Sequence, residues 1–263
     1  MSLSNYVFME KLMSIIDAYD QSKPLFTPED FYDVHEKCGD ACILTFSKHV
    51  QDKVLSEYAH EIVAQSGTAN GKNPVYRLID SGVLFYLSPI GSAVAGTVLH
   101  EVHALTGATK FISFGSCGIL DDRCREKIIV PTEAYRDEGF SYHLLMPADY
   151  IRVKNAEFVE ETLAAMGIET IVGRTWMTDA IYRETVDKIA RRKADGCVCV
   201  EMECSGLQAI CDYLGCDFFT FFFSGDLLLE KWERGRLGNE IEKSAQIDCF
   251  DLAKSIIEKA CGI

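Results

Sequence analysis

Residues 197–228 decide the fold, and they read CVCVEMECSGLQAICDYLGCDFFTFFFSGDLL. The stretch begins with an apolar run up to Val200, continues as an amphipathic segment that ends near Gly215, and finishes with a second apolar run at 218–223. This order predicts a strand, a helix and a strand, the unit that makes parallel strands neighbours in one sheet. We take this unit as the centre of the expected sheet.

Acidic side chains follow both predicted strands. In open parallel sheets, ligands bind at the carboxyl ends of the strands. Carboxylates gathered at that edge therefore predict a functional site rather than a stabilising feature. The three residues are Glu201 and Glu203 after the first strand and Asp226 after the second.

The composition is that of a large globular protein. With 263 residues and 48% hydrophobic content, the chain can form one big α/β domain or two smaller ones. Its formal net charge of −14 argues against nucleic acid or an anionic membrane as the main partner. No apolar run approaches the roughly 20 residues of a membrane helix. Because the N-terminus has acidic residues in its apolar pattern and no basic leader, we expect no signal peptide and a cytoplasmic protein.

The eleven cysteines include no CxxC pair, and most of them lie in apolar segments. This predicts reduced thiols that act as small core residues in the cytosol, in preference to disulfides or metal ligands. The histidines at 100 and 103 do not have the HExxH spacing of a zinc helix, so no metal site is expected. The absence of a GxSxG elbow argues against a serine hydrolase.

Strands and helices alternate along the chain, which predicts a single doubly wound α/β domain with a central mixed, mostly parallel sheet flanked by helices. The domain is expected to span residues 1–263, with 1–40 as a helical extension packed on it. The predicted helices are 6–19, 50–64, a helix from the turn at 88–92 to about 106, 155–166 and 244–260. The further predicted strands are 41–46, 76–79, 83–87, 110–114, 127–130 and 169–175, and loops are expected at 67–73, 135–150 and 177–185.

Two glycine-bearing turns are expected directly after predicted strands. One is Gly-Ser-Cys-Gly at 115–118, and the other, at 88–92, contains Gly91. Exposed backbone N–H groups in such turns, together with the Ser116 hydroxyl, can bind an anion. The pair suggests a phosphate or ribose pocket, although either turn alone is equally consistent with an ordinary tight turn. Neither a GxGxxG nor a GxxxxGK[ST] fingerprint is present.

Combined, these features resemble the nucleoside phosphorylase family, which includes purine nucleoside phosphorylases, uridine phosphorylases and nucleosidases. The resemblance extends from about residue 41 to the end, and its most specific part is the Val-Glu-Met-Glu motif at 200–203. It implies that Met202 packs on the ribose, that Glu203 holds the ribose 2′- and 3′-hydroxyls, and that Asp226 protonates a purine base. Glu201 of the same motif is expected to belong to the substrate site.

Other segments resemble further parts of that family's site. The segment 114–118 is similar to the strand and turn at the phosphate and base, and 88–92 is similar to an upstream glycine turn. The segment 178–182 is similar to the loop that covers the sugar and base, and 136–139 is a further candidate for a contact. The implied residues are Ser116 for phosphate, and Gly91, Cys117, Gly118, Ile181 and Tyr182 for substrate.

The phosphate loop departs from the family pattern. Phe-Ser-Lys-His at 46–49 stands where the family has Gly-Asp-Pro-x-Arg, and Ser113 replaces the arginine before the glycine turn. Phosphate must then be bound by Ser116 with Lys48 or with a basic residue of a neighbouring copy, or it is not bound at all. Gly225 stands at the position of the serine that precedes the family's acid, and 230–242 is expected to be an exposed loop or a lid.

The resemblance implies a phosphorylase that cleaves the N-glycosidic bond of a purine nucleoside, or of uridine, to give the free base and (deoxy)ribose 1-phosphate. Purines are favoured because Asp226 suits them and because 183–196 lacks the Gln-x-Arg pair that grips uracil. The alternatives are a nucleosidase that uses water and a degenerate homologue that binds a nucleoside without turnover. No cofactor is expected beyond inorganic phosphate as co-substrate, and assembly as a homodimer or a hexamer (a trimer of dimers) is implied.

Overall fold

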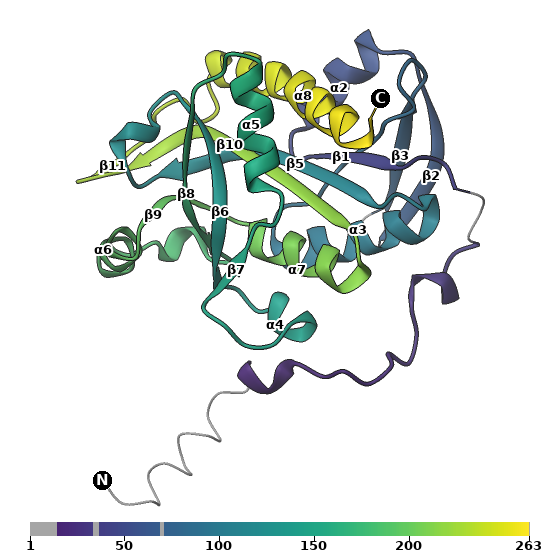
Figure 1. Cartoon of the computed structure of the whole chain (residues 1–263), viewed down its shortest axis with the longest axis horizontal. Coiled ribbons are helices and arrows are strands. Elements are labelled where there is room, and N and C mark those ends of the chain that lie inside the picture. The colour runs from purple at the N-terminus through teal and green to yellow at the C-terminus, as the bar shows by residue number, and fades with distance from the viewer. Residues whose placement is uncertain (1–14, 34–36, 69–70, 263) are drawn as a thin grey trace, which may run out of the picture.

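Apolar segments form one mixed sheet, and helices cover its two faces, as the sequence predicts (Figure 1). The computed structural model describes residues 15–33, 37–68 and 71–262. The strands are β1 Ala41–Thr45, β2 His60–Thr68, β3 Gly71–Leu78, β4 Leu84–Leu87, β5 Lys110–Ile119, β6 Ile128–Asp137, β7 Tyr150–Arg152, β8 Thr170–Thr178, β9 Cys197–Glu201, β10 Asp217–Leu228 and β11 Trp232–Glu233. The helices are α2 Lys48–Glu57, α3 Ser92–Thr106, α4 Ser141–Leu144, α5 Ala156–Ala165, α6 Val186–Ala194, α7 Cys204–Leu214 and α8 Glu240–Cys261, and the 3-10 turns are η1 Ile16–Ala18, η2 Pro28–Asp30, η3 Asp122–Cys124 and η4 Ile181–Arg183.

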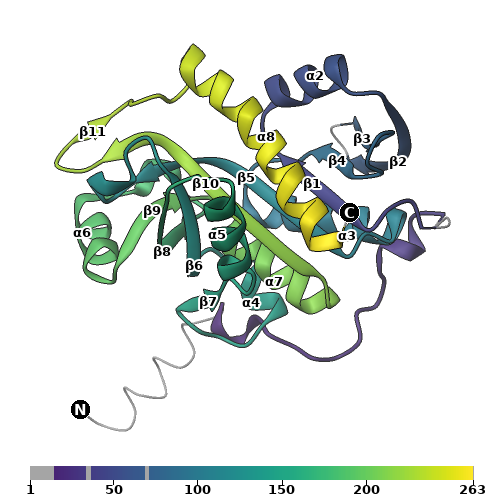
Figure 2. The same cartoon turned by 45° about the horizontal axis from the view of Figure 1, so that its top comes forward.

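The sheet order is β11-β10-β6-β8-β9-β5-β1-β4-β3-β2, with β7 on β6. The fully buried β1 runs parallel to both β4 and β5, and β10 runs parallel to β5. Helices α2, α5 and α8 lie on one face, whereas α3, α4 and α7 lie on the other (Figures 1 and 2). Because the helices pack on the two faces of the sheet, the carboxyl ends of the central strands remain available for a site between the two helical layers.

The unit at 197–228 folds as β9, α7 and β10, but its two strands are not adjacent. β5 lies between them: it runs parallel to β10 and pairs antiparallel with β9 at Gly118–Val200. The pairings β10–β6, β6–β8 and β8–β9 then close a ring of five strands. The expectation of neighbouring parallel strands is wrong because β5 continues past Phe114 to Ile119. Gly118 permits this close approach, since a Cβ there would lie 2.4 Å from Leu228 Cδ1 and 3.0 Å from Val200 Cγ1.

Several predicted boundaries differ from the structure. The helix predicted at 50–64 ends at Glu57, because its β-branched second half pairs with β3 as strand β2. Of the loop predicted at 67–73, residues 67–68 and 71–73 belong to these two strands. The strand predicted at 127–130 continues to Asp137, with a register shift after Pro131 that accommodates the missing N–H. The residues at 115–118 are part of β5 rather than a turn, and β10 does not stop at Ser224.

Some of the remaining elements agree with the predictions, whereas α4 and the start of β7 fall in the loop predicted at 135–150, and α6 and β11 were not predicted. Helices α3, α5 and α8 confirm the predicted helices at these positions, and β3 and β4, which pair antiparallel, confirm the strands predicted at 76–79 and 83–87. Most of the helix predicted at 6–19 lies outside the described residues. In the part that the structure describes, 15–19, the helical element is the short η1. From the rest of the extension, η2 contacts α3.

The cysteines behave as predicted. All eleven lie within the described residues and form no disulfide, and nine of them are buried. Among the described helices, none combines the length and apolar character that a membrane span requires.

Candidate active site

Glu201 anchors the amino-terminal end of α7. One of its carboxyl oxygens, Oε2, accepts hydrogen bonds from the backbone N–H groups of Glu203 (2.8 Å) and Cys204 (2.7 Å). Thr175 Oγ1 donates to Oε1 at 3.2 Å, and the Glu201 side chain is only 6% exposed. Because both oxygens are engaged, Glu201 holds the start of the helix in place, where a negative charge is also favoured by the helix dipole.

Glu203 is the N-cap residue of α7 and faces the glycine turn before α3. Its Oε1 accepts a hydrogen bond of 2.7 Å from the backbone N–H of Gly91. Gly91 has a φ of +100°, a conformation that favours glycine. The two helices pack so closely that a Cβ on Gly206 would lie 2.5 Å from Ser92 Oγ. This packing keeps Glu203 against Gly91, and the half-buried Met202 lies between β9 and the helix.

The carboxyls at this end of the sheet share a poorly solvated, negatively charged environment. Burial, and next the charge of Glu201, raise the pKa of Glu203 to about 8. Burial raises the pKa of Glu201 to about 7, against the opposing effect of its backbone N–H donors. Burial also raises the pKa of Asp179, which follows β8, and Glu138 adds to that effect. Hydrogen-bond donors such as sugar hydroxyls would relieve this charge.

Asp226 lies in an irregular part of β10. The register with β5 shifts between Ser224 and Leu227, and such a bulge redirects the side chains within it. As a result, Asp226 Oδ1 lies beside Gly118, where a Cβ would be 3.2 Å from it. Gly118 in turn pairs with Val200, the residue before Glu201. Gly118 at the end of β5 therefore lies between the residue that precedes Glu201 in β9 and Asp226 in β10.

An open cavity of about 900 Å³ lies beside Asp226. The predicted cover residues Ile181 and Tyr182 line it together with Asp226. Trp232 lines it as well and donates its indole N–H to Asp226 Oδ2 at 2.8 Å, although the Trp232 side chain is 61% exposed. Asp226 therefore lies at the wall of a large cavity and has one aromatic hydrogen-bond partner.

Ser116, Cys117 and Lys48 occupy three different environments. Ser116 is half-buried and packs close to Gly225, where a Cβ would lie 3.1 Å from Ser116 Cβ. The Cys117 side chain is 3% exposed and its Sγ lies 3.6 Å from the Phe223 carbonyl oxygen, so the thiol belongs to the core. Lys48 is exposed at the start of α2 and forms an ion pair with Asp52 on the same helix. Of the three, Ser116 has its side chain beside Gly225, the residue before Asp226.

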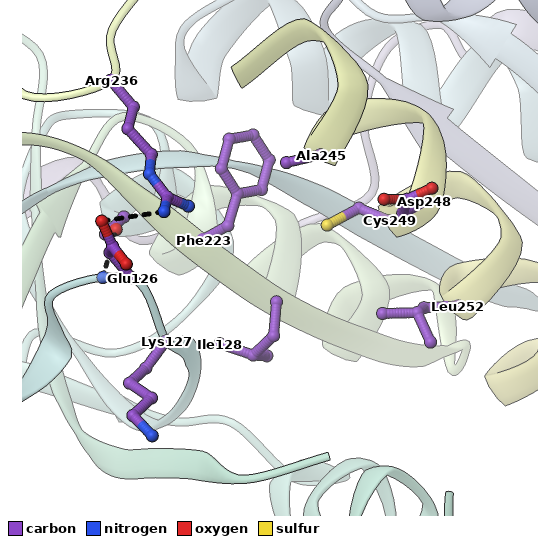
Figure 3. A pocket seen from close by; sticks show the side chains of 10 residues that line it. Glu126, Lys127, Ile128, Phe223, Arg236, Ala245, Asp248, Cys249 and Leu252 are labelled. Atoms are coloured by element: carbon purple, nitrogen blue, oxygen red, sulfur yellow. Dashed lines mark hydrogen bonds and ion pairs between the residues drawn. The ribbon is translucent and has the colours of Figure 1, made fainter. Parts of the chain in front are cut away.

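The segment 229–239, part of the predicted lid, is anchored on the bulge of β10. The backbone N–H of Arg236 donates to the Gly225 carbonyl at 3.0 Å, and a Cβ on Gly235 would lie 2.4 Å from the same oxygen. The Arg236 guanidinium reaches Glu126 at 2.9 Å, beside a smaller cavity of about 170 Å³ (Figure 3). The position of this segment is therefore coupled to the strand that carries Asp226.

The segment 136–139 supports the loop over the site. The buried Arg136 donates from Nε to Ser141 Oγ at 2.7 Å and from Nη1 to the Met146 carbonyl at 2.8 Å. Glu138 accepts hydrogen bonds from the Ser141 N–H at 2.9 Å and from Ser205 Oγ at 3.1 Å. These contacts tie the loop to α7.

The structure brings together most of the predicted site, in two groups. Gly91, Glu201, Met202 and Glu203 form one group, and Asp226, Gly118, Ile181 and Tyr182 form the other. Sequence reasoning missed Trp232 and Glu184, which both line the cavity beside Asp226. Trp232 could have been identified from the sequence, because it belongs to the segment 230–242, which follows Asp226 and was expected to form a loop or a lid.

The chain is similar to several known proteins. A family model described as the phosphorylase superfamily matches residues 41–258. The purine nucleoside phosphorylase DeoD-type 1 of Shewanella oneidensis is 26% identical over 125 residues, which cover 46% of this chain and only about half (53%) of that relative.

Solved structures share the fold. The purine nucleoside phosphorylase of Toxoplasma gondii, in complex with immucillin-H, has a TM-score of 0.70 and 16% identity over 86% of this chain and 94% of that chain. The AMP nucleosidase of Bacteroides thetaiotaomicron has a TM-score of 0.66 and 16% identity over 84% of this chain and 88% of that chain. At these identities, the similarity concerns the fold alone.

Proposed function

Because the chain belongs to the phosphorylase superfamily, we propose that it is a nucleoside phosphorylase that acts on a purine nucleoside. Phosphate cleaves the N-glycosidic bond and leaves a free base and (deoxy)ribose 1-phosphate. One observation supports this most directly: Glu203, held by Gly91, and Asp226, beside Gly118, stand on the two sides of the end of β5.

The proposed roles follow from the charges of the reaction. Positive charge develops on the sugar as the bond breaks, and the electron pair of the C–N bond moves to the base. Glu203 accepts the sugar hydroxyls, and Met202 forms a soft, polarizable floor. Asp226 donates a proton to the base nitrogen, a step that contributes about 10²–10⁴-fold in rate. A phosphate oxygen attacks the anomeric carbon.

The other site residues have supporting roles in this proposal. Glu201 is a positioning residue, because its oxygens are bonded to the start of α7. The main chain of Gly118 lies against the Asp226 carboxyl, and Ile181 and Tyr182 cover the base. Ser116 binds phosphate, whereas Cys117 contributes only its main chain.

A nucleosidase that uses water is the second candidate. The observation that favours it is the ion pair of Lys48 with Asp52, which engages the basic residue expected at the phosphate. The fold similarity to an AMP nucleosidase is consistent with this alternative. Uridine in place of a purine, and binding without turnover, stay as further alternatives.

Assembly into a homodimer, or a hexamer built from dimers, is part of the proposal. Ile90 and Val94 flank the turn at Gly91 and are 61% and 53% exposed. A neighbouring copy that covered them would also reach the sugar site. We place the protein in the cytosol, where its thiols stay reduced, and assign it no cofactor besides inorganic phosphate.

Product analysis tests the proposal. Inosine, guanosine, adenosine, uridine and methylthioadenosine are incubated with and without phosphate, and the sugar product is identified by mass spectrometry. Ribose 1-phosphate formed from purines only when phosphate is present supports the proposal. Free ribose without phosphate identifies the nucleosidase, and no turnover of any substrate indicates a binding protein.

A further inference from the structure

The cavity beside Asp226 is larger than a bare base requires. Its volume of about 900 Å³ lies near the top of the range, roughly 300–1,000 Å³, in which whole small-molecule ligands are bound. The residues proposed to hold the sugar, Glu203, Met202 and Gly91, do not line it. Because Asp226, the residue proposed to protonate the base, does line it, the cavity lies on the base side of the proposed site.

The walls of this cavity are mostly apolar and come from two separate elements. One wall consists of α6 and the residues before it, and the other consists of the end of β10 and β11. Tyr182 is 96% exposed at the rim, so the cavity is open to solvent on that side. The apolar lining residues are Ile181, Val186, Ile189, Ala190, Leu228, Leu229 and Leu237. An apolar group that extends from the base would be desolvated here.

Glu184 is a half-buried carboxyl in the wall of this cavity. Its side chain makes no hydrogen bond or ion pair with any residue that the structure describes, whereas Lys193 in the same wall donates to the Leu229 carbonyl at 3.0 Å. Burial, and next the charge of Asp226, raise the pKa of Glu184 to about 7. A carboxyl that is half-buried without a partner costs free energy, and an N–H donor on a ligand would recover it.

We propose that this cavity binds an apolar substituent attached to the base through an N–H group that Glu184 accepts, so that the preferred substrates are nucleosides with an N-substituted purine base. The inference rests on the proposed function and narrows its substrate class. Asp226 protonates the purine ring, Glu184 accepts a hydrogen bond from the exocyclic N–H, and the substituent lies between α6 and the end of β10. An unsubstituted base leaves the apolar part of the cavity hydrated.

The test compares adenosine with N6-benzyladenosine as substrates. We expect the wild-type kcat/KM to be about tenfold or more higher for the benzylated nucleoside, since burial of a phenyl ring contributes at least that factor. Ala190→Phe narrows the cavity and is expected to lower the benzyladenosine-to-adenosine ratio about tenfold. Ala194→Phe is the matched control, because Ala194 is exposed on the same helix and does not line the cavity, and it should leave the ratio unchanged. Glu184→Gln should lower kcat/KM for benzyladenosine less than Glu184→Ala, because the amide oxygen still accepts a hydrogen bond from the exocyclic N–H.

A binding experiment separates this inference from the proposed function. The free bases adenine and N6-benzyladenine are titrated calorimetrically into wild type and Ala190→Phe, which requires no catalysis. Tighter binding of the benzylated base, lost in Ala190→Phe, supports the inference even if no nucleoside is cleaved. Equal or weaker binding and turnover of the benzylated compounds overturn it, and they leave the proposed function intact if adenosine is still cleaved.

Discussion

The backbone N–H of Gly91 donates a hydrogen bond of 2.7 Å to the carboxyl of Glu203, and this contact joins the turn before α3 to the start of α7. The two residues are far apart in the chain. They meet because α3 and α7 pack closely where the Ser92 side chain faces Gly206, which has no side chain. One oxygen of Glu203 is thereby fixed, and the carboxyl is oriented before any ligand arrives, which reduces the entropy lost on binding.

Glu203→Ala is expected to abolish measurable turnover. The variant removes the acceptor of two sugar hydroxyls, whose hydrogen bonds favour the ionised carboxyl and counter the raised pKa of Glu203. Hydrogen bonds to a charged group contribute about 1.5–3 kcal/mol each, or about 10²–10⁴-fold together. The measurement is kcat/KM by HPLC of the released base. Glu157→Ala, an exposed change on α5, serves as the control and should match wild type. Wild-type rates from Glu203→Ala would reject its role.

The pH dependence of stability should reflect the raised pKa values of Glu201 and Glu203. Both rise from an ordinary 4.5, to about 7 and about 8. Between these limits the folded protein holds protons that the unfolded chain has lost, so these groups lower the free energy of unfolding as pH rises from about 4.5 to about 8. Glu203→Gln removes one of them. Its Tm should therefore fall less than that of wild type between pH 5 and pH 8 in scanning calorimetry, and parallel curves would contradict the assignment.

Asp226→Asn should impair purine turnover far more than uridine turnover. The amide cannot donate the proton that a purine leaving group requires, so kcat for inosine is expected to fall about 10²–10⁴-fold. A uridine rate reduced to the same degree would show that the residue acts in some other way. Asp217→Asn is the matched control at the other end of β10, where Asp217 is half exposed and pairs with Lys110 at 3.4 Å.

Trp232 should report on occupation of the base site. Of the two tryptophans, Trp176 is fully buried, whereas Trp232 is exposed and bonded to Asp226. A base that engages Asp226 must displace or share the indole N–H, so tryptophan emission should change on titration with hypoxanthine. Trp232→Phe should abolish that change. An equal response from the variant would place the base elsewhere.

Gly235→Ala should displace the segment 229–239. A Cβ there would lie 2.4 Å from the Gly225 carbonyl oxygen and 2.5 Å from Leu227 Cδ1, so the segment must move off the bulge that positions Asp226. We expect a higher KM together with a loss of stability. Gly167→Ala is the control: its φ of +77° has a similar cost of about 1 kcal/mol, but nothing lies within 4 Å of the added Cβ. If both variants raise KM equally, the effect is not due to the anchoring.

Sequence patterns predicted secondary structure correctly where the environment of each residue follows from its neighbours in the chain. The alternation of apolar runs predicted β9, α7 and β10, and the resemblance at 200–203 assigned Glu203 and Asp226 to one site. The helix predicted at 50–64 failed for the opposite reason. The apolar residues of its second half fit both the helical and the strand periodicity. Pairing with β3 makes this half a strand.

The sequence alone determined the α/β class, the family and the identity of the acidic residues, because apolar periodicity and a short motif are properties of contiguous residues. Only the tertiary structure decided that β5 runs between β9 and β10, that Glu201 is bound to the start of α7, and that Trp232 reaches Asp226. Each of these depends on a close approach of segments distant in the chain. Gly118 permits the close approach of β5 to β9 and β10, and Gly206 permits that of α7 to α3. The sequence does not show which side chains lie opposite these glycines.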